Sequence, residues 1–460
     1  MLTVMKFGGT SVGSVEALER VANIVVGTEG NKVVVTSAMS GITNFLVACC
    51  EDLENQREET IEVFEKKHVC VAKAMLDEKQ FAEFMEEFTP RMEAFKALLY
   101  DEKAAKSPYY QDNVTSQGER FSSLLLCHKI RSLGYKSVAL TSEDCGIIAE
   151  GKPLNGNANL RMTETQMGIN LMPYINRGYI PVITGFYGVT KDDWIPLTFG
   201  RGGSDYAAAV VANALNADML EIWTDVDGFM SADPRVVPNA VKIDEMSYAE
   251  AAELAYFGAK VLHPRTIEPV RKKHIPLKVR NSFKPEEKGT LISRYREYSN
   301  ELLRSAAAKT DLSIITISSP EIAYRPDIVA KILAKISEND DSLYSISTSL
   351  STVAFLIHNN DVKSTLSKLY EMDNADVEKI DVTSDVALIC CVGDDLISTS
   401  GVSGEIFSAV KEVDANVMMI SEGASAVALN FVVRNCDVLP VIKILHERFV
   451  EEDEDYAESE

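Results

Sequence analysis

Three glycine-containing loops carry the residues best suited to hold a charged ligand. They read KFGGTS at residues 6–11, SAMSGIT at 37–43 and GRGGSD at 200–205, and each follows a predicted strand and precedes a predicted helix. Glycine lets the backbone approach a ligand closely, while the free N–H groups and the dipole of the following helix favour an anion. Lys6 and Arg201 add positive charge. These loops therefore predict a pocket for a ligand that carries phosphate.

The usual phosphate and metal signatures are missing from the sequence. It contains no GxxxxGK[ST] motif and no GxGxxG motif, since the stretch at 200–205 lacks a third glycine. Asp225 and Asp227 are not followed by further EF-hand ligands, and the histidines and cysteines show neither HExxH nor CxxC spacing. We therefore expect no protein-built metal site. One such loop could be an ordinary tight turn, but three with two embedded cations favour a functional site.

The elements that must position these loops alternate between strands and helices. Short apolar runs predict strands at residues 2–7, 32–36, 137–141, 179–184 and 219–224. Amphipathic patterns between the runs predict helices; after Ser14, for example, Leu18, Val21 and Val25 share one face. This alternation predicts an α/β fold with a largely parallel sheet sandwiched by helices. In such a sheet the loops at the carboxyl ends of the strands gather around one ligand site.

The chain, at 460 residues, is too long for one compact core, and its pattern changes along its length. Residues 51–107 predict a helical excursion, expected to be a solvated bundle beside the core. A Pro-, Gly- and charge-bearing stretch at 283–300 predicts a domain junction, after which a strand–helix–strand–strand pattern occurs twice. The expected domains are residues 1–297, 298–384 and 385–460, the last with an acidic tail.

Charge and hydropathy exclude several classes of partner. A formal net charge of −23 repels phosphate backbones, so no nucleic-acid partner is expected. No apolar run is long enough to span a bilayer, and the N-terminus lacks a signal-peptide pattern. Most of the eight cysteines sit in apolar stretches, which is typical of buried free thiols in a reducing compartment. The sequence thus predicts a cytoplasmic protein with no membrane partner.

Six motifs, in a fixed order along the chain, resemble those of aspartate kinase in the amino acid kinase superfamily. They are KFGGTS at 6–11, SAMSGIT at 37–43, SQGER at 116–120, GRGGSDY at 200–206, WTDVDGFMSADPR at 223–235 and FGAKVLHP at 257–264. The two C-terminal modules look like the family's paired ACT domains, which are ferredoxin-like α+β units. The resemblance implies an amino acid kinase domain followed by a tandem ACT regulatory domain. Since nothing like a homoserine dehydrogenase half follows, it implies the monofunctional form.

The reaction implied by this resemblance is ATP plus L-aspartate giving ADP and 4-phospho-L-aspartate. It is the first step toward lysine, threonine and methionine. The attacking carboxylate is already ionised at neutral pH, so the reaction needs no general base. Catalysis must then come from positioning and electrostatic stabilisation as the γ-phosphoryl group transfers. ATP is expected to bring Mg²⁺ with it, held largely by phosphates and water.

The resemblance also assigns roles to individual residues. Lys6 is expected to be catalytic, contacting the transferring phosphoryl group, while Arg201 clamps the aspartate α-carboxylate and Glu119 accepts from the ammonium. Asp205 is expected to be catalytic by orienting Lys6 or the ammonium; alternatively, it is only a first-turn carboxylate stabilised by the helix dipole. The other expected substrate-binding residues are Thr43, Gly202, Gly203 and Ser204.

The nucleotide half of the site is assigned in the same way. The implied ATP-binding set is Lys6, Phe7, Gly8, Gly9, Thr224, Asp225, Met230, Arg235, Lys260 and Val261. Met230 stands where some relatives have tyrosine. A backbone contact to the nucleotide would survive that change, whereas a ring contact would not.

Two other functions compete with this interpretation. Another amino acid kinase, acting on glutamate, acetylglutamate or a nucleoside monophosphate, would share glycine-rich loops but not the combination of SQGER, GRGGSDY and tandem ACT modules. A non-catalytic sensor would use the ACT modules alone. Such a sensor has no need for Lys6, Glu119 and Arg201 together, so the sequence favours the kinase.

The tandem modules imply regulation and assembly. We expect an amino-acid effector, lysine first and threonine as the alternative or co-effector, bound near Asp327, Ser345 and Ser349. Tyr344 and Leu350 stand where lysine-sensitive relatives are expected to have acidic residues, which weakens the case for lysine. The family pairs these modules across subunits, so a homodimer or higher homo-oligomer is expected. Alternatively, the modules only dimerise.

Overall fold

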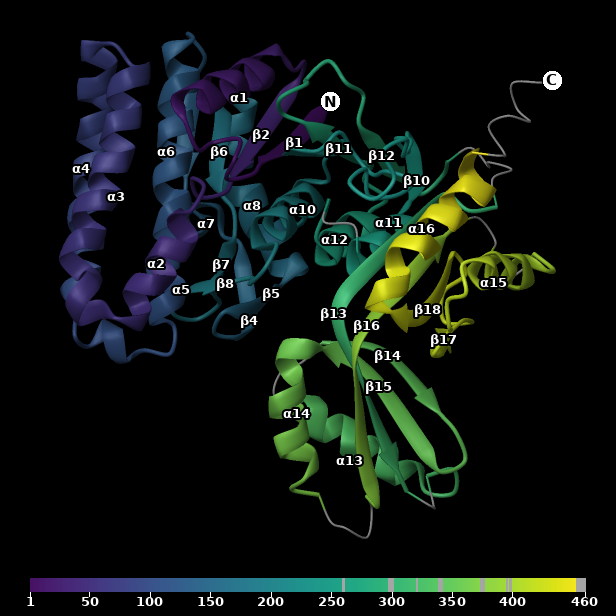
Figure 1. Ribbon diagram of the computed structural model, residues 1–460. Helices are drawn as coiled ribbons and strands as arrows, with labels where there is room; N and C mark the ends of the chain where they lie inside the picture. The colour runs from purple at the N-terminus through teal and green to yellow at the C-terminus, as the bar shows by residue number, and fades with distance from the viewer. Residues whose placement is uncertain are drawn as a thin grey trace, which may run out of the picture. The chain divides into compact units, whose positions relative to one another are not determined.

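The computed structural model describes residues 1–258, 261–296, 302–319, 322–337, 342–372, 377–393, 396 and 399–451 (Figure 1). The chain divides into two compact units. The N-terminal unit consists of Met1–Phe229, Asp244–Tyr248 and Val261–Arg296. The C-terminal unit consists of Met230–Ile243, Ala249–Lys260 and Glu297–Glu460. Both units are therefore discontinuous in sequence.

An eight-stranded sheet forms the centre of the N-terminal unit, in the order β10-β12-β11-β9-β1-β2-β6-β3. Its strands are β1 Leu2–Phe7, β2 Asn31–Thr36, β3 Ser137–Leu140, β6 Ile180–Thr184, β9 Met219–Thr224, β10 Glu245–Ser247, β11 Leu277–Asn281 and β12 Thr290–Ser293. The six strands from β11 to β3 are parallel, whereas β12 runs antiparallel to β11. The predicted parallel sheet is confirmed. Its central strands are buried along nearly their whole length, as continuous apolar runs such as VVV require.

Helices pack against this sheet in two groups. The helices are α1 Val15–Gly27, α2 Ile42–Glu51, α5 Tyr110–Thr115, α6 Gln117–Ser132, α7 Ser142–Cys145, α8 Leu160–Asn170, α9 Met172–Asn176, α10 Gly203–Leu215 and α12 Ile267–Lys272. Helices α1 and α6 share one core cluster with Met5, Phe7 and Val34 of the sheet. Helix α10 packs on β1 and β9 and contacts α8 and α12. Successive side chains of β1 point to opposite faces of the sheet. Phe7 therefore lies in the core with α1 and α6, whereas Lys6 points to the other face.

The helical excursion forms two long helices, α3 Leu53–Met75 and α4 Glu78–Tyr100, which lie beside α6 (Figure 1). The expected helices are confirmed, but the pair is more than a solvated bundle. Phe64, Phe84 and Phe95 are fully buried on its inner face. Phe64 makes an edge contact with Phe121 of α6 and a tilted contact with Phe95. These buried aromatic side chains make α3 and α4 part of the hydrophobic core of the unit.

A small second sheet, which the sequence did not predict, completes the N-terminal unit. Its strands, in the order β5-β4-β7-β8, are β4 Ile148–Lys152, β5 Asn155–Ala158, β7 Tyr187–Thr190 and β8 Pro196–Thr198. Strand β8 leads directly into residues 199–202 and then α10. The small sheet thus supports the third glycine-rich loop.

The C-terminal unit contains a six-stranded sheet in the order β14-β15-β13-β16-β18-β17. Its strands are β13 Ser305–Ser318, β14 Leu343–Thr348, β15 Thr352–His358, β16 Lys379–Val392, β17 Met419–Ser421 and β18 Ala428–Arg434. Its helices are α11 Tyr248–Phe257, whose first residue belongs to the other unit, α13 Pro326–Ser337, α14 Val362–Leu369, α15 Val402–Glu412 and α16 Val438–His446. The repeated strand and helix order expected for two ACT modules is confirmed.

The two modules share their central strands. The second half of β13 pairs with β15, while its first half, Ser305–Lys309, pairs with the last residues of β16. Strand β18 then pairs with that same end of β16. Each module thus completes its sheet with part of a strand from the other. The expected boundary between residues 384 and 385 falls inside β16, and the domain limits stay predictions.

Short helical turns complete the described secondary structure. They are η1 Ala104–Lys106, η2 Pro264–Thr266, η3 Asn359–Asp361, η4 Asn435–Asp437 and the π-helical turn η5 Glu447–Glu451. Among the described residues, no helix combines the length and apolar character needed to cross a bilayer. The cytoplasmic location stays a prediction.

Candidate active site

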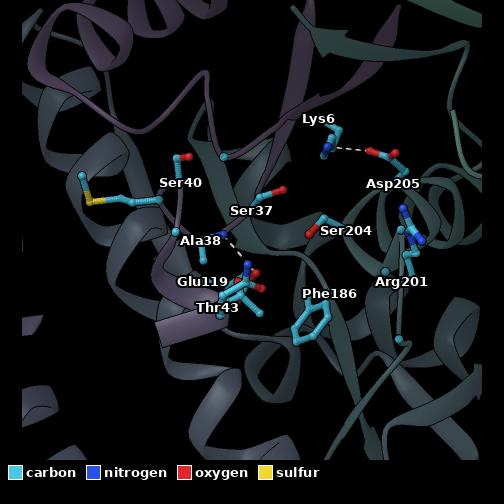
Figure 2. A pocket seen from close by; sticks show the side chains of 17 residues that line it. Lys6, Ser37, Ala38, Ser40, Thr43, Glu119, Phe186, Arg201, Ser204 and Asp205 are labelled. Atoms are coloured by element: carbon cyan, nitrogen blue, oxygen red, sulfur yellow. Dashed lines mark hydrogen bonds and ion pairs between the residues drawn. The ribbon is translucent and has the colours of Figure 1, made fainter. Parts of the chain in front are cut away.

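One cavity of about 350 Å³ lies where the three glycine-rich loops meet in the N-terminal unit (Figure 2). The cavity lies at the carboxyl ends of β1, β2 and β6, because the chain leaves each of these strands through a segment that lines it. The predicted site residues that line it are Lys6, Gly9, Thr43, Glu119, Arg201, Gly202, Gly203, Ser204 and Asp205. All of the residues expected to be catalytic or to bind substrate are thus brought together.

Lys6 and Asp205 form an ion pair at the wall of this cavity. Lys6 lies near the end of β1, and its Nζ is 2.5 Å from Oδ1 of Asp205 in the first turn of α10. The two side chains are only 10% and 16% exposed. A partly buried cation held by one carboxylate is fixed in direction and has little freedom to turn into solvent. Of the roles left open for Asp205, the geometry supports orientation of Lys6.

Glu119 places a buried carboxyl group in the same cavity. Its Oε1 accepts the backbone N–H of Ala38 at 2.9 Å, whereas its Oε2 has no hydrogen-bond partner among the described residues. Burial raises the pKa of Glu119 to about 8, although the Ala38 N–H and the charge of Lys6 oppose this shift. A carboxyl group in this state can accept a cationic donor, because a positive charge nearby would restore its ionised form.

The third loop presents Arg201 between two glycines with left-handed backbone. Gly200 has φ 72° and Gly202 has φ 70°, a conformation that other residues adopt only with strain. A Cβ on Gly202 would come within 2.3 Å of the Cβ of His263, so no larger residue fits there. Figure 2 shows Arg201 with Lys6 and Asp205 along one side of the cavity, and Glu119 and Thr43 along the other. A pair of cations therefore faces a carboxyl group across the cavity.

Only part of the predicted nucleotide set lines this cavity. The ring of Phe7 is buried and stacks on Trp223, with ring centroids 5.9 Å apart, so only its backbone is available to a ligand. The N–H of Gly8 donates to the carbonyl of Trp223 at 3.4 Å. Thr224 and Asp225 follow β9 and bond to each other, Thr224 Oγ1 donating to Asp225 Oδ1 at 3.1 Å. Of the predicted nucleotide residues, Lys6 and Gly9 line the cavity.

The remaining nucleotide residues fall in other parts of the chain. Met230 and Arg235 belong to the C-terminal unit, where Arg235 is exposed and forms an ion pair with Asp233 at 2.6 Å. Val261 begins the last segment of the N-terminal unit. Lys260 lies outside the described residues. The roles of these four residues stay predictions.

The predicted effector residues lie in the first module of the C-terminal unit. Asp327 pairs with Arg325 at 2.9 Å and with Lys331 at 3.8 Å, and the hydrogen bond from Arg325 holds the pKa of Asp327 below its usual value. Ser349 Oγ shares a hydrogen bond with Thr352 Oγ1 at 2.7 Å. The hydroxyl of Ser345 is buried without a partner in the described part of the chain. Because Asp327 is already paired with Arg325 and Lys331, it would have to give up these ion pairs to bind the ammonium of an effector.

The cavity contains residues that were not assigned from the sequence. They are Ser37, Ala38, Met39, Ser40, Gly41, Asn44, Phe186 and Gly200. Most belong to the loops already recognised, and their contact with the cavity follows from those loops. Phe186 was the clear omission; it lies just past β6 and has φ 72°, which is unusual for a bulky residue. Its position after a buried parallel strand was the signal that could have identified it.

Comparison with known proteins shows to which family the chain belongs. The sequence model of the amino acid kinase family matches residues 1–281, and that of an ACT domain matches residues 389–449. The chain belongs to the amino acid kinase family. It is 33% identical to lysine-sensitive aspartokinase 3 of Escherichia coli over 458 residues, covering 98% of this chain and 99% of that protein. The resemblance to the aspartokinases is thus confirmed.

Solved structures of aspartokinases agree with this family and with the fold. E. coli aspartokinase III in complex with aspartate and ADP superposes with a TM-score of 0.84 at 32% identity, covering 97% of this chain and 99% of that one. The same enzyme in complex with lysine and aspartate gives a TM-score of 0.81 at 32% identity, covering 98% and 99%. The expected amino acid kinase fold with a C-terminal ACT region is confirmed.

Proposed function

We propose that the chain transfers the γ-phosphoryl group of ATP to the side-chain carboxylate of L-aspartate, giving 4-phospho-L-aspartate and ADP. This product begins the pathway to the aspartate-derived amino acids. One observation carries the proposal: a single cavity joins the Lys6–Asp205 pair, the Arg201 guanidinium and the buried carboxyl group of Glu119. These charges complement the two charged groups on the aspartate α-carbon and the phosphoryl group. The aspartate and ADP in the E. coli aspartokinase III structure support it.

Aspartate is positioned by charges on opposite sides of the cavity. Arg201 binds the α-carboxylate, since a guanidinium can donate two parallel hydrogen bonds to it. Glu119 accepts from the α-ammonium through Oε2. The Thr43 and Ser204 hydroxyls and the backbone of Gly202 and Gly203 supply further contacts to the substrate. The side-chain carboxylate is then left to face Lys6.

Phosphoryl transfer then depends on Lys6. The substrate carboxylate is ionised and can attack directly, so no residue has to remove a proton. Two anions must nevertheless approach each other, and the charge that spreads over the phosphoryl oxygens needs stabilisation. Lys6 supplies a cation already oriented by Asp205, so little reorganisation is needed in the transition state.

ATP binds through the remaining predicted residues, with the backbone of Phe7, Gly8 and Gly9 next to the phosphates. Thr224 and Asp225 follow β9, and we assign them to the nucleoside part. Met230, Arg235, Lys260 and Val261 complete the proposed set. Aspartate and the γ-phosphoryl group occupy the cavity itself.

Mg²⁺ is implied by the chemistry of ATP. The carboxylates in the cavity that could bind it are those of Asp205 and Glu119. Asp205 is already paired with Lys6, and Glu119 is buried. In the described ranges no group of three or more His, Cys, Asp or Glu side chains is arranged to hold a metal ion. These donors fit an ion bound mainly by phosphate oxygens and water, with Asp205 as a nearby carboxylate. When bound, the ion neutralises charge on the β- and γ-phosphates.

We assign feedback inhibition to the first ACT module. We assign subunit pairing to the two edge strands of the six-stranded sheet. Lysine, alone or with threonine, is the proposed inhibitor, bound near Asp327, Ser345 and Ser349. The lysine in one E. coli aspartokinase III structure and the unpartnered Ser345 hydroxyl support this. The chain is proposed to form a homodimer or larger homo-oligomer, because β14 and β17 end the sheet and leave backbone groups to be paired.

The decisive experiment incubates the protein with ATP, Mg²⁺ and L-aspartate and traps the acyl phosphate as a hydroxamate with hydroxylamine. Parallel reactions replace aspartate with glutamate, acetylglutamate or a nucleoside monophosphate. Hydroxamate formation from aspartate alone supports the proposal. Turnover of another acceptor in preference to aspartate, or no turnover of any of them, would refute it.

A further inference from the structure

Arg265 lies in η2, directly behind the glycine-rich loop that carries Arg201. Its Nη1 donates to the carbonyl of Phe199 at 2.7 Å, and its Nη2 donates to the carbonyl of Gly156 at 2.6 Å and to Asn157 Oδ1 at 2.8 Å. Its guanidinium carbon also lies 4.6 Å from the ring centroid of Tyr206. One side chain thus joins β5, the loop after β8 and helix α10.

These contacts lie on both sides of Arg201 along the chain. Phe199 precedes it by two residues, and Tyr206 directly follows Asp205, the partner of Lys6. Holding Phe199 and Tyr206 together restricts the path of residues 200–205 between them. Arg265 is absent from the described residues that line the cavity, so it acts on the site only through this loop.

Other contacts hold the same loop from neighbouring points. The buried carboxylate of Asp112 accepts from the N–H and the Oγ1 of Thr198, both at 2.7 Å. The close approach of His263 to Gly202 packs the same η2 region against the loop. Asp112 fixes the entry to the loop, and η2 supports its far side.

Tyr206 of α10 also joins the loop to β5, because its ring packs edge-on against Phe199, with ring centroids 5.0 Å apart, and its hydroxyl accepts the N–H of Ala158 at 3.2 Å. Arg265 adds a second link, with three hydrogen bonds to β5 and the loop and a guanidinium stacked on Tyr206.

The chemistry of this position requires a guanidinium. Its donors form a rigid planar fork and can reach acceptors in three directions while the flat face stacks on an aromatic ring. A lysine ammonium at the same place could reach one or two of these acceptors but could not stack on Tyr206 as a plane. Arg265→Lys therefore keeps the charge and removes the geometry.

We propose that Arg265 is a positioning residue that fixes the Arg201 guanidinium and Asp205 in the geometry that binds the acceptor substrate. This inference rests on the proposed function, in which Arg201 binds the α-carboxylate of aspartate. The nucleotide is held mainly by other segments, so loosening this loop affects aspartate more than ATP.

The test compares steady-state kinetics of the wild type, Arg265→Lys and Arg265→Ala. A misplacement of the clamp by about 1 Å lowers kcat/KM for aspartate by roughly ten- to a hundredfold. We expect that loss in both variants, with the KM for ATP within about twofold of wild type. Free guanidinium ion, added at non-denaturing concentration, should restore part of the activity of Arg265→Ala, which a purely structural defect would not allow.

Arg271→Ala is the matched control. Arg271 follows on α12, is exposed, and forms its ion pair with Glu268 at 2.7 Å. It should leave both KM values unchanged and show no guanidinium effect. If Arg265→Ala fails to fold, the kinetics of Arg265→Lys test the inference without it. An unchanged kcat/KM for aspartate, or equal changes in kcat/KM for aspartate and ATP, overturns the inference. An inactive wild type overturns the proposed function and this inference with it.

Discussion

At the scale of single residues, the cavity concentrates charge where solvent is largely excluded. Lys6 and Asp205 neutralise each other, while Glu119 holds a carboxyl group that burial pushes toward its protonated form. Electrostatic interactions are stronger in such surroundings than in water, so each group has a large effect on binding and rate.

Lys6→Ala should lower kcat by about a hundred- to a thousandfold, because it removes a preoriented cation from the transition state. The variant should still fold, although its thermal midpoint should fall because Asp205 loses its partner in a largely buried place. Hydroxamate production and circular dichroism melting measure the two effects. Lys73→Ala, which removes an exposed lysine in the last turn of α3, is the control. Near-normal turnover of Lys6→Ala would contradict the proposed role.

The kcat/KM for aspartate should rise with pH, with a midpoint at about 8, and level off about one pH unit above it. Below its pKa of about 8, Glu119 is largely protonated in the free protein and accepts the substrate ammonium poorly. Deprotonation above that pH restores the charge pair, so affinity for aspartate increases as the pH rises. Glu119→Gln should weaken aspartate binding and remove this pH dependence. A Glu119→Gln profile that still rises toward pH 8 would assign the titration to another group.

At the scale of elements, loops at the ends of strands carry the chemistry and helices beside them supply rigidity. The pair α3 and α4 contributes through an aromatic cluster against α6, the helix that begins near Glu119. Inside this cluster lies His68 of α3. Its Nδ1 is 2.7 Å from the carbonyl of Phe64, and its Nε2 is buried with no partner in the described ranges.

Burial of His68 should make the stability of this region sensitive to acid. Desolvation lowers its pKa to about 4, against about 6.5 in the unfolded chain. The contribution of neutral His68 to the free energy of unfolding is fully present above about pH 6.5. It is lost as the pH falls toward 4, because the unfolded chain binds the proton more readily than the folded one. At pH 5.5 the loss is about 1 kcal/mol. Urea unfolding of wild type and His68→Met at pH 7.5 and 5.5 measures it.

The comparison with His68→Met isolates this group from the other titrating residues. The free-energy difference between pH 7.5 and 5.5 should be smaller in the variant by about that 1 kcal/mol. Equal differences in both proteins would show that His68 does not titrate as burial implies. A second variant at the exposed His274 should behave like wild type, because its ring lies near the surface and bonds to Arg294.

At the scale of the whole molecule, the chain forms two units that are each discontinuous in sequence. Residues 230–243 and 249–258 fold with the ACT modules rather than with the kinase sheet on either side of them in sequence. Ser231 illustrates this: its Oγ lies 2.8 Å from Nε2 of His446, and its carbonyl accepts the N–H of Ala306. The kinase segment of the chain therefore contributes elements to the regulatory unit.

We expect lysine, alone or with threonine, to inhibit the enzyme by binding the first ACT module rather than by competing with aspartate. Asp327→Ala should weaken this inhibition, since the variant removes an acceptor for the effector ammonium. Activity is titrated with each amino acid separately and together. Asp381→Ala, which removes a carboxylate paired with Lys379 at 2.8 Å, is the control in the same module.

Two results would separate the parts of this claim. No inhibition by either amino acid, singly or combined, would refute regulation by these effectors. Inhibition that Asp327→Ala leaves unchanged would refute only the proposed pocket.

The chain should be at least a dimer in solution. The edge strands β14 and β17 carry exposed Ile346 and Ile420, and pairing with a second copy would cover them. Light scattering should give at least twice the mass of one chain, and Ile346→Lys should shift the equilibrium toward monomer. A monomer mass that does not change with concentration would contradict this expectation.

The parallel sheet and the three glycine-rich loops could be predicted from local patterns. Apolar runs such as KVVVT form buried strands, and glycines after them mark loops that gather at one edge. The roles of individual site residues came from the resemblance to aspartate kinase, and Phe186 was missed. The repeated strand and helix order of the ACT modules was equally visible. Lys6 and Arg201 could therefore be placed in one site from the loops themselves, whereas Glu119 was added by the resemblance of SQGER to the aspartate kinase motif.

The interactions between those residues depend on contacts that form only in the folded chain. The ion pair of Lys6 with Asp205, the raised pKa of Glu119 and the contacts of Arg265 join segments far apart in the sequence. Desolvation depends on every atom packed around a group, and a hydrogen bond depends on distance and angle, so neither can be read from local spacing. The shared strands β13 and β16 likewise arise from pairing between modules, which the pattern of each module alone does not specify.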